Sequence, residues 1–425
     1  MNRKNAHIGG AIAVFFGLKL LLGLALIGAS SRFLPVSGFV IFSQLFLFYA
    51  LLATLSAAGV QNGLVRQIAL AGGSIVDERR AVAAALRIWL VASVTMIVAV
   101  VALRLPLSRM LVGDGSVADI VPLLTLLAVI GGLGVLACAV LNGRRRPAAS
   151  LLLQSAGLIV GGTACLWQLV AGDGTGAVIG YAAGPLVTGV LAAAIVWRSG
   201  IGVRVIGDAR AADIRLLLAY SLVFLLIAVL TPSTLFALRH FYREDFGVDL
   251  LGYWLAANRT SDVTSQILGL YMAQIFLPRI TQERDGPRSR RVIIQTFLLG
   301  SAVMLGGWLL FVAASRFFVE SFLSAAYLPA IPFIGGYLLG DALRVSASIG
   351  THLMLARARL ATAVAIEGGA AALFAAYLAG FAAAGRPEAP YWAYPAAYAT
   401  MALVLMACFA RAYRTTAHTD FEGRA

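Results

Sequence analysis

Long apolar runs, separated by short polar segments, make up most of the chain. Each run is close to the roughly 20 mainly apolar residues that an α-helix needs to cross a bilayer, and together they predict about twelve transmembrane helices. The predicted spans are Ala11–Ser31, Gly38–Val60, Leu86–Leu105, Asp119–Leu141, Ala148–Val170, Ala177–Trp197, Ile214–Leu238, Leu251–Leu277, Val292–Ala314, Pro329–Leu355, Leu360–Ala383 and Tyr391–Ala410. The connections are too short for a soluble domain, so the sequence predicts an all-α polytopic membrane protein.

Basic residues fall mainly in alternate connections. With the N-terminus placed in the cytoplasm, cytoplasmic segments hold more than three Lys or Arg for each one on the opposite side, with clusters at Arg79–Arg80, Arg144–Arg146 and Arg279–Arg291. Such a bias sets membrane orientation. We therefore expect a multi-pass protein of the bacterial inner membrane with both termini cytoplasmic. Its longest external loops are expected at Arg239–Leu250 and Ser315–Leu328.

Composition excludes several classes of function. Charged residues make up 12% of the 425 residues, against about a quarter in soluble domains. The net charge of +14 comes from clusters between apolar runs rather than patches with interleaved aromatics, so we expect no nucleic-acid partner. Cys138, Cys165 and Cys408 lie inside predicted helices, and with 4 histidines they form no disulfide or metal pattern. We expect no metal and no cofactor.

A longer polar connection divides the predicted helices into six and six. It runs from Arg198 to Asp213 and is expected in the cytoplasm. We therefore predict an N-terminal six-helix bundle at residues 1–200, a cytoplasmic linker at 201–213 and a C-terminal six-helix bundle at 214–425. Because six is even, the two halves would be repeats related by an axis along the membrane normal.

Charged residues inside the spans are the most informative, because each costs about 2.5–3.5 kcal/mol at the bilayer centre. They are Lys19, Arg259, Asp262, Asp341, Arg344 and Glu367. In the eighth and tenth spans, polar residues recur at helical spacing and so share one face, which must point at protein or water. For Glu367 a plain structural role is equally consistent with the sequence.

Two interpretations of these charges stay open. Arg259 and Asp262, like Asp341 and Arg344, are three residues apart, so each pair could form an ion pair within one helix. Lys19 has no acidic neighbour in its own helix, and therefore either has a partner across the bundle or faces a hydrated cavity. Charged faces on several helices favour a central polar cavity, which is typical of a substrate or ion pathway.

The same cations suit a phosphate group. Guanidinium forks bind phosphate through two hydrogen bonds, and lysine binds it as a point charge. Lys19, Arg259 and Arg344 lie within predicted spans, and Arg66 and Arg87 lie near the predicted cytoplasmic end. Three central cations are matched by three carboxylates, so composition alone does not make the cavity positive.

Four short motifs resemble a known family of transporters. Gly17–Lys19, Ser37–Gln44, Ala58–Arg66 and Leu141–Arg144 are similar to polysaccharide repeat-unit flippases of the Wzx type. These flippases belong to the multidrug/oligosaccharidyl-lipid/polysaccharide (MOP) exporter superfamily. Outside these motifs, the likeness rests on helix number and topology.

The resemblance implies two six-helix bundles as in multidrug exporters of the MATE type, opening to alternate sides. It implies translocation of undecaprenyl-pyrophosphate-linked oligosaccharide repeat units from the cytoplasmic to the periplasmic leaflet, for O-antigen or exopolysaccharide biosynthesis. A polysaccharide polymerase and a chain-length regulator are the expected protein partners. The candidate substrate-binding cations are Lys19 first, then Arg66, Arg259 and Arg344. The candidate carboxylates for ion coupling are Asp262, Asp341 and Glu367.

Two other functions compete with this one. A multidrug antiporter of the same superfamily would bind cationic drugs, so acidic residues should dominate its N-terminal bundle, whereas the first span here carries Lys19. A membrane polymerase or glycosyltransferase would need a sizeable periplasmic loop, and the longest predicted external loops are about a dozen residues. No paired-acid, nucleophile or metal motif is present, so we expect no catalytic residues and no enzyme.

Overall fold

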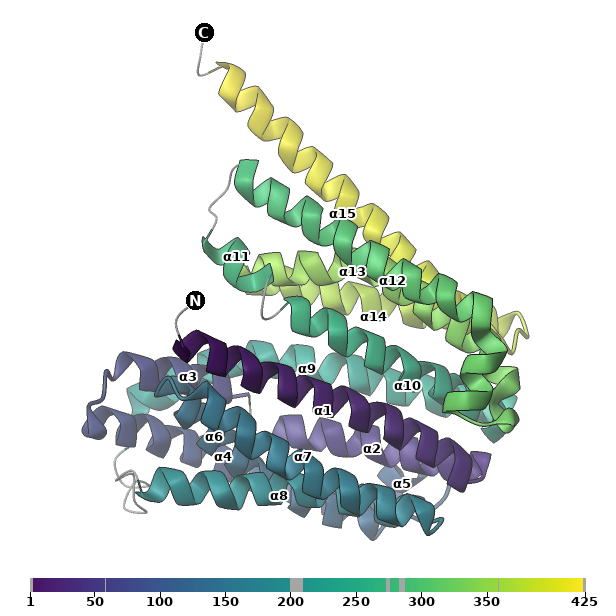
Figure 1. The fold of residues 1–425 in the computed structure, drawn as a ribbon, viewed down its shortest axis with the longest axis horizontal. Helices are drawn as coiled ribbons and strands as arrows, with labels where there is room; N and C mark the ends of the chain where they lie inside the picture. The colour runs from purple at the N-terminus through teal and green to yellow at the C-terminus, as the bar shows by residue number, and fades with distance from the viewer. Residues whose placement is uncertain are drawn as a thin grey trace. The chain divides into compact units, whose positions relative to one another are not determined.

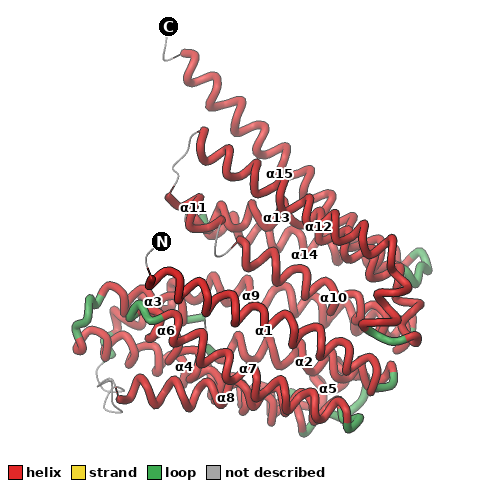
Figure 2. Tube along the Cα trace, in the orientation of Figure 1, coloured by secondary structure: helices red, strands yellow, loops and turns green. Residues whose placement is uncertain are grey.

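The chain is helical throughout the part that the structure describes. The computed structural model describes residues 3–57, 59–198, 209–272, 276–282, 287–357 and 359–422. Within these ranges helices are joined by short loops and no strand forms (Figure 2). An α-helix satisfies its backbone hydrogen-bonding groups within one segment, as hydrocarbon requires. The predicted all-α polytopic class is confirmed.

The helices form two compact units, Met1–His240 and Phe241–Ala425 (Figure 1). The first contains α1 (Arg3–Phe33), α2 (Val36–Ser56), α3 (Gln61–Leu70), α4 (Ile75–Ala102), α5 (Arg104–Val112), α6 (Ile120–Gly143), α7 (Pro147–Val170), α8 (Gly174–Arg198) and most of α9 (Ala211–Phe246). The second contains α10 (Val248–Tyr271), α11 (Leu277–Gln282), α12 (Pro287–Phe322), the 3₁₀-helix η3 (Ala325–Ala330), α13 (Ile331–Ala356), α14 (Leu360–Ala383) and α15 (Ala389–Glu422).

Within the described residues, each predicted span overlaps a helix of the structure. Among the described residues, 10 helices are long and apolar enough to cross a membrane, and the predicted spans in α9 and α10 are the two outside that set. The polar stripe of α10 lowers its mean hydropathy. Most of the predicted linker falls in 199–208, outside the described residues, and the two compact units divide within α9, after His240. The division at 201–213 stays a prediction.

Two predicted external loops, Arg239–Leu250 and Ser315–Leu328, are mostly helical, so the prediction of loops was wrong, whereas their external location stays a prediction. Helix α9 continues to Phe246 because residues of one face stay buried past the predicted end of the span, among them Arg239 and Tyr242. Helix α12 continues to Phe322 with a break at Ala314, where φ is −128° and ψ is 26°. The residues that follow form η3 instead of an open loop.

Glycine allows close packing in the N-terminal unit. Helix α8 packs against both α6 and α7. A Cβ on Gly134 of α6 would lie 2.7 Å from Cα of Gly189 in α8, and one on Gly161 of α7 would lie 2.9 Å from Cα of Gly184. Small residues at such contacts let transmembrane helices approach at backbone distance. Helices α6, α7 and α8 therefore pack closely together, and α1 packs on α7.

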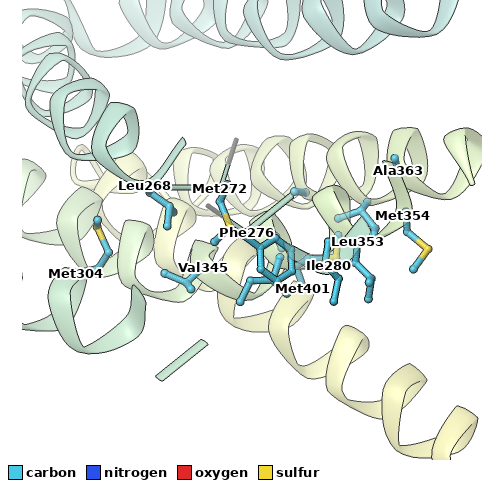
Figure 3. Packing of buried hydrophobic residues seen from close by; sticks show 14 residues of the cluster. Leu268, Met272, Phe276, Ile280, Met304, Val345, Leu353, Met354, Ala363 and Met401 are labelled. Atoms are coloured by element: carbon cyan, nitrogen blue, oxygen red, sulfur yellow. The ribbon is translucent and has the colours of Figure 1, made fainter. Parts of the chain in front are cut away.

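Helix α13 is the centre of the C-terminal unit, because α10, α12, α14 and α15 all pack on it. At the end of α13 that contains Leu353, apolar side chains from several helices form one buried cluster (Figure 3). Met272 and Phe276 join this cluster from the chain that follows α10, and Met401 joins it from α15. The cluster fixes the position of the polar middle of α13.

Candidate functional site

A cavity of about 390 Å³ lies within the N-terminal unit. Residues of α1, α3, α6, α7 and α8 line it. Its polar lining consists of one cationic side chain and five neutral ones: Lys19, Gln61, Asn142, Gln154, Tyr181 and Thr188. No carboxylate occurs among the described residues that line it. The cavity therefore carries a net positive charge whenever Lys19 is protonated.

Helix α1 places Lys19 at this cavity, with its side chain half-buried. An ammonium group in a membrane-spanning segment is costly unless water or an anion solvates it. Here the neutral amides and hydroxyls of the lining hold no charge that would neutralise it. Of the two interpretations of Lys19 left open by the sequence, the structure favours the cavity. What this arrangement offers chemically is a mainly apolar pocket with one cation and a few neutral polar groups, in which an anionic group is favoured over a cationic one.

The neutral lining is held in place by its neighbours. The ring of Phe46 in α2 lies 4.6 Å from that of Tyr181, measured between centroids. Gln154 donates hydrogen bonds from Nε2 to the backbone oxygen and hydroxyl of Ser150, at 3.3 and 3.1 Å. With the amide nitrogen so occupied, the carbonyl oxygen of Gln154 is the part of this side chain that can accept hydrogen bonds from a guest.

Arg66 lies near the cavity but does not line it. Helix α3 contributes Gln61 and Val65 to the lining, whereas the side chain of Arg66, the next residue, is exposed. Arg66 is therefore a neighbour in sequence of the lining residue Val65, and not itself part of the lining.

In the C-terminal unit, the buried carboxylate of Asp341 connects three helices. It is 2% exposed and accepts hydrogen bonds from Ser261 at 2.9 Å, from Thr264 at 2.7 Å and from Tyr394 at 3.0 Å. The hydroxyl of Ser265 lies 3.4 Å from the same carboxylate and accepts a 3.3 Å hydrogen bond from Arg344. Asp341 is thus held by hydroxyl groups of α10 and α15.

The direct ion pair between Asp341 and Arg344, one of the two interpretations left open by the sequence, is replaced by this network. The Ser265 hydroxyl bridges the two groups, and the Arg344 guanidinium carbon lies 5.7 Å from the centre of the Tyr398 ring, within cation–π range. No local pattern pointed to Tyr394 or Tyr398 as partners, because α14 lies between α13 and α15 in the chain.

The other predicted residues of this unit have simpler surroundings. Arg259 and Asp262 form an ion pair within α10 at 3.8 Å, which was one of the two open interpretations, and the Asp262 side chain is 50% exposed. Glu367 of α14 accepts a 2.9 Å hydrogen bond from Thr351 of α13. Asp262 is therefore the most accessible of the three candidate coupling carboxylates.

Sequence reasoning missed two buried arginine contacts. Arg239, predicted to lie in an external loop, is 2% exposed in α9 and donates a 3.1 Å hydrogen bond to Oε1 of Gln44 in α2. Arg144 forms an ion pair with the buried Glu78, joining the end of α6 to the start of α4. The partners are 195 and 66 residues apart, so no local pattern could have revealed them.

The structure places Lys19 and Arg66 in the N-terminal unit, and Arg259, Arg344 and the three carboxylates in the C-terminal unit. The cavity shared by all of these charges stays a prediction. Within the described residues, no group of three or more His, Cys, Asp or Glu could hold a metal ion.

Comparison with known proteins gives one relative and two solved structures of particular interest. No protein-family model matches the chain. A lipid III flippase of Escherichia coli (strain K12) is 25% identical over 320 residues, covering 73% of this chain and 75% of that protein. An inward-facing multidrug resistance MATE family transporter of the MOP superfamily matches with a TM-score of 0.73 at 14% identity, over 92% of both chains. The lipid II flippase MurJ, in an inward closed conformation, matches with a TM-score of 0.70 at 12% identity, over 95% of this chain and 87% of that one.

Proposed function

Because the chain has the fold of MOP-superfamily transporters, as its sequence motifs predicted, we propose that it is a flippase for lipid-linked oligosaccharides. The substrate we propose is an undecaprenyl-pyrophosphate-linked repeat unit, moved from the cytoplasmic to the periplasmic leaflet of the bacterial inner membrane for O-antigen or exopolysaccharide biosynthesis. The observation that carries the proposal is the cavity around Lys19, whose described lining has one cation and no carboxylate. Similarity to a lipid III flippase supports a lipid-linked substrate.

The chemistry of such a substrate matches the cavity. A sugar-pyrophosphate headgroup is polar and anionic, so it cannot enter hydrocarbon, whereas its polyprenyl tail can stay in the lipid. Lys19 supplies a positive charge for the pyrophosphate. Gln61, Asn142, Gln154 and Thr188 supply neutral donors and acceptors of the kind that sugar hydroxyls need.

Alternating access completes the proposed mechanism. Rocking of two helical bundles about a substrate site exposes that site to each side of the membrane in turn. We propose that the bundles at residues 1–200 and 214–425 move in this way, with both termini cytoplasmic. Arg66, Arg259 and Arg344 would then act as further cations along the route. Asp262, Asp341 and Glu367 are the proposed carboxylates for coupling to a proton or sodium gradient (Asp262 first, since it is half-exposed).

A multidrug antiporter is the second candidate, favoured by the similarity to a MATE transporter. Its cationic substrates would be repelled from a cavity whose one charged lining residue is Lys19 among those described. The named relative and solved structures are flippases and transporters, which supports a role other than catalysis.

The test is a deletion strain in which lipid-linked repeat units are extracted and probed from the periplasmic side. We expect these units to accumulate in a form protected from the probe, and a plasmid copy of the chain to restore export. An unchanged pool of repeat units would contradict the proposed function. Resistance of the same strain to cationic drugs tests the second candidate, because loss of an antiporter would lower it.

A further inference from the structure

A second cavity, of about 400 Å³, lies in the C-terminal unit beside the end of α10, α11 and the start of α12. Its walls are of two kinds. Arg279, Gln295 and Tyr271 are polar, whereas Leu298 and Leu299 are apolar. This cavity belongs to a different unit from the one around Lys19.

The polar side of this cavity lies in a basic stretch of the chain. Arg279 is exposed, and so are Arg288, Arg290 and Arg291 in the first turns of α12. The stretch from Arg279 to Arg291 has more than twice as many arginines as acidic residues, so its net charge is positive. Positive charge of this kind beside a membrane span attracts anionic lipid headgroups.

The apolar side of the cavity faces outward. Leu298 is 60% exposed and Leu299 is 54% exposed, on a helix long and apolar enough to cross a membrane. Arg291 and Leu298 are seven residues apart, which corresponds to about 10 Å along an α-helix. That length spans the boundary between the headgroup layer and the acyl chains. Tyr271 is of the residue type enriched at this boundary.

We propose that this cavity binds an anionic phospholipid of the surrounding bilayer. Arg279 and Gln295 bind the phosphate, and the part of an acyl chain nearest the headgroup lies along Leu298 and Leu299. The site goes beyond the proposed transport function and does not depend on it, because a resident bilayer lipid need not be transported. Inorganic phosphate shares the headgroup chemistry but lacks the apolar part, so it can be distinguished by experiment.

The experiment is a lipid titration of the purified full chain, read by native mass spectrometry, with phosphatidylglycerol and phosphatidylcholine as probes. We expect phosphatidylglycerol to be preferred. Arg279→Gln should weaken its binding about fivefold, the effect of one basic residue near a lipid surface. Arg359→Gln is the matched control, because Arg359 is also an exposed arginine of the same unit but does not line the cavity. It should leave phosphatidylglycerol binding unchanged.

A second variant, Leu298→Gln, tests the apolar wall and should also weaken phosphatidylglycerol binding, since Leu298 is exposed and its replacement need not disturb folding. If Arg279→Gln and Arg359→Gln weakened phosphatidylglycerol binding equally, the proposal would be overturned, because binding would then depend on total charge rather than on the cavity. A second result would also overturn the proposal, in favour of a site for phosphate alone. In that case millimolar inorganic phosphate would displace phosphatidylglycerol, and Leu298→Gln would leave phosphatidylglycerol binding unchanged.

Discussion

Replacement of Asp341 by alanine should destabilise the C-terminal unit. The carboxylate is 2% exposed and accepts hydrogen bonds of 2.7–3.0 Å from Ser261, Thr264 and Tyr394. A hydrogen bond to a charged group contributes about 1.5–3 kcal/mol, so three sum to roughly 4.5–9 kcal/mol before the carboxylate's lost hydration is subtracted. The variant also removes the acceptor of the Ser261 and Tyr394 hydroxyls, whereas Thr264 keeps a 2.8 Å hydrogen bond to the backbone oxygen of Ser261. We therefore expect a loss of about 3 kcal/mol in the free energy of unfolding.

The assay is thermal unfolding of the purified protein in detergent. A loss of about 3 kcal/mol in a unit of this size corresponds to a Tm lower by about 6–12 °C. Asp341→Asn should lose less, because its amide oxygen still accepts hydrogen bonds. Tyr394→Phe alone should lower the Tm. Added to Asp341→Ala, it should lower the Tm little further, since the two residues share one interaction. A Tm for Asp341→Ala within about 2 °C of the wild-type value would refute the reasoning.

Four further variants test other contacts. Glu78→Gln removes the buried charge that pairs with Arg144, and should lower the free energy of unfolding by about 2–3 kcal/mol in the same thermal assay. Gly161→Ala should lower the free energy of unfolding by about 1–3 kcal/mol, because the new Cβ would contact α8. Gly17→Ala is the control and should be tolerated, because nothing lies within 4 Å of its Cβ. Arg259→Gln should change the unfolding free energy by less than about 1 kcal/mol, since its ion pair is 3.8 Å long and the partner Asp262 is 50% exposed, yet reduce polymer export measured in cells. Normal export with Arg259→Gln would remove that residue from the proposed route.

Hydrophobic pattern alone predicted the helices and the inward direction of two polar faces. Part of each stripe does point at protein, because Ser265 of the α10 stripe contacts Asp341 of the α13 stripe, whereas Asp262 of the α10 stripe is 50% exposed. Lipid makes this inference strong, since a polar group facing hydrocarbon has no water to bind. The motif around Lys19 likewise pointed to the superfamily whose fold the chain has.

Partners distant in sequence could not be predicted in the same way. Helical periodicity tells which residues share a face but not which helices meet, so the donation from Tyr394 to Asp341 and the pair of Glu78 with Arg144 had no local signal. The burial of Arg239 was missed for a related reason. Charge near the end of an apolar run usually marks a loop, but here a glutamine from another helix pairs with it.

The most direct test of the account is the rate at which the purified protein flips an oligosaccharide linked to polyprenyl pyrophosphate across reconstituted vesicles. Lys19→Ala should slow flipping at least tenfold, which corresponds to about 1.4 kcal/mol of lost interaction with the pyrophosphate, whereas Lys19→Arg should keep much of the rate because the positive charge remains. Thermal unfolding of both variants controls for misfolding. Flipping by Lys19→Ala at the wild-type rate would contradict the claim that the cation in the N-terminal cavity binds the substrate headgroup.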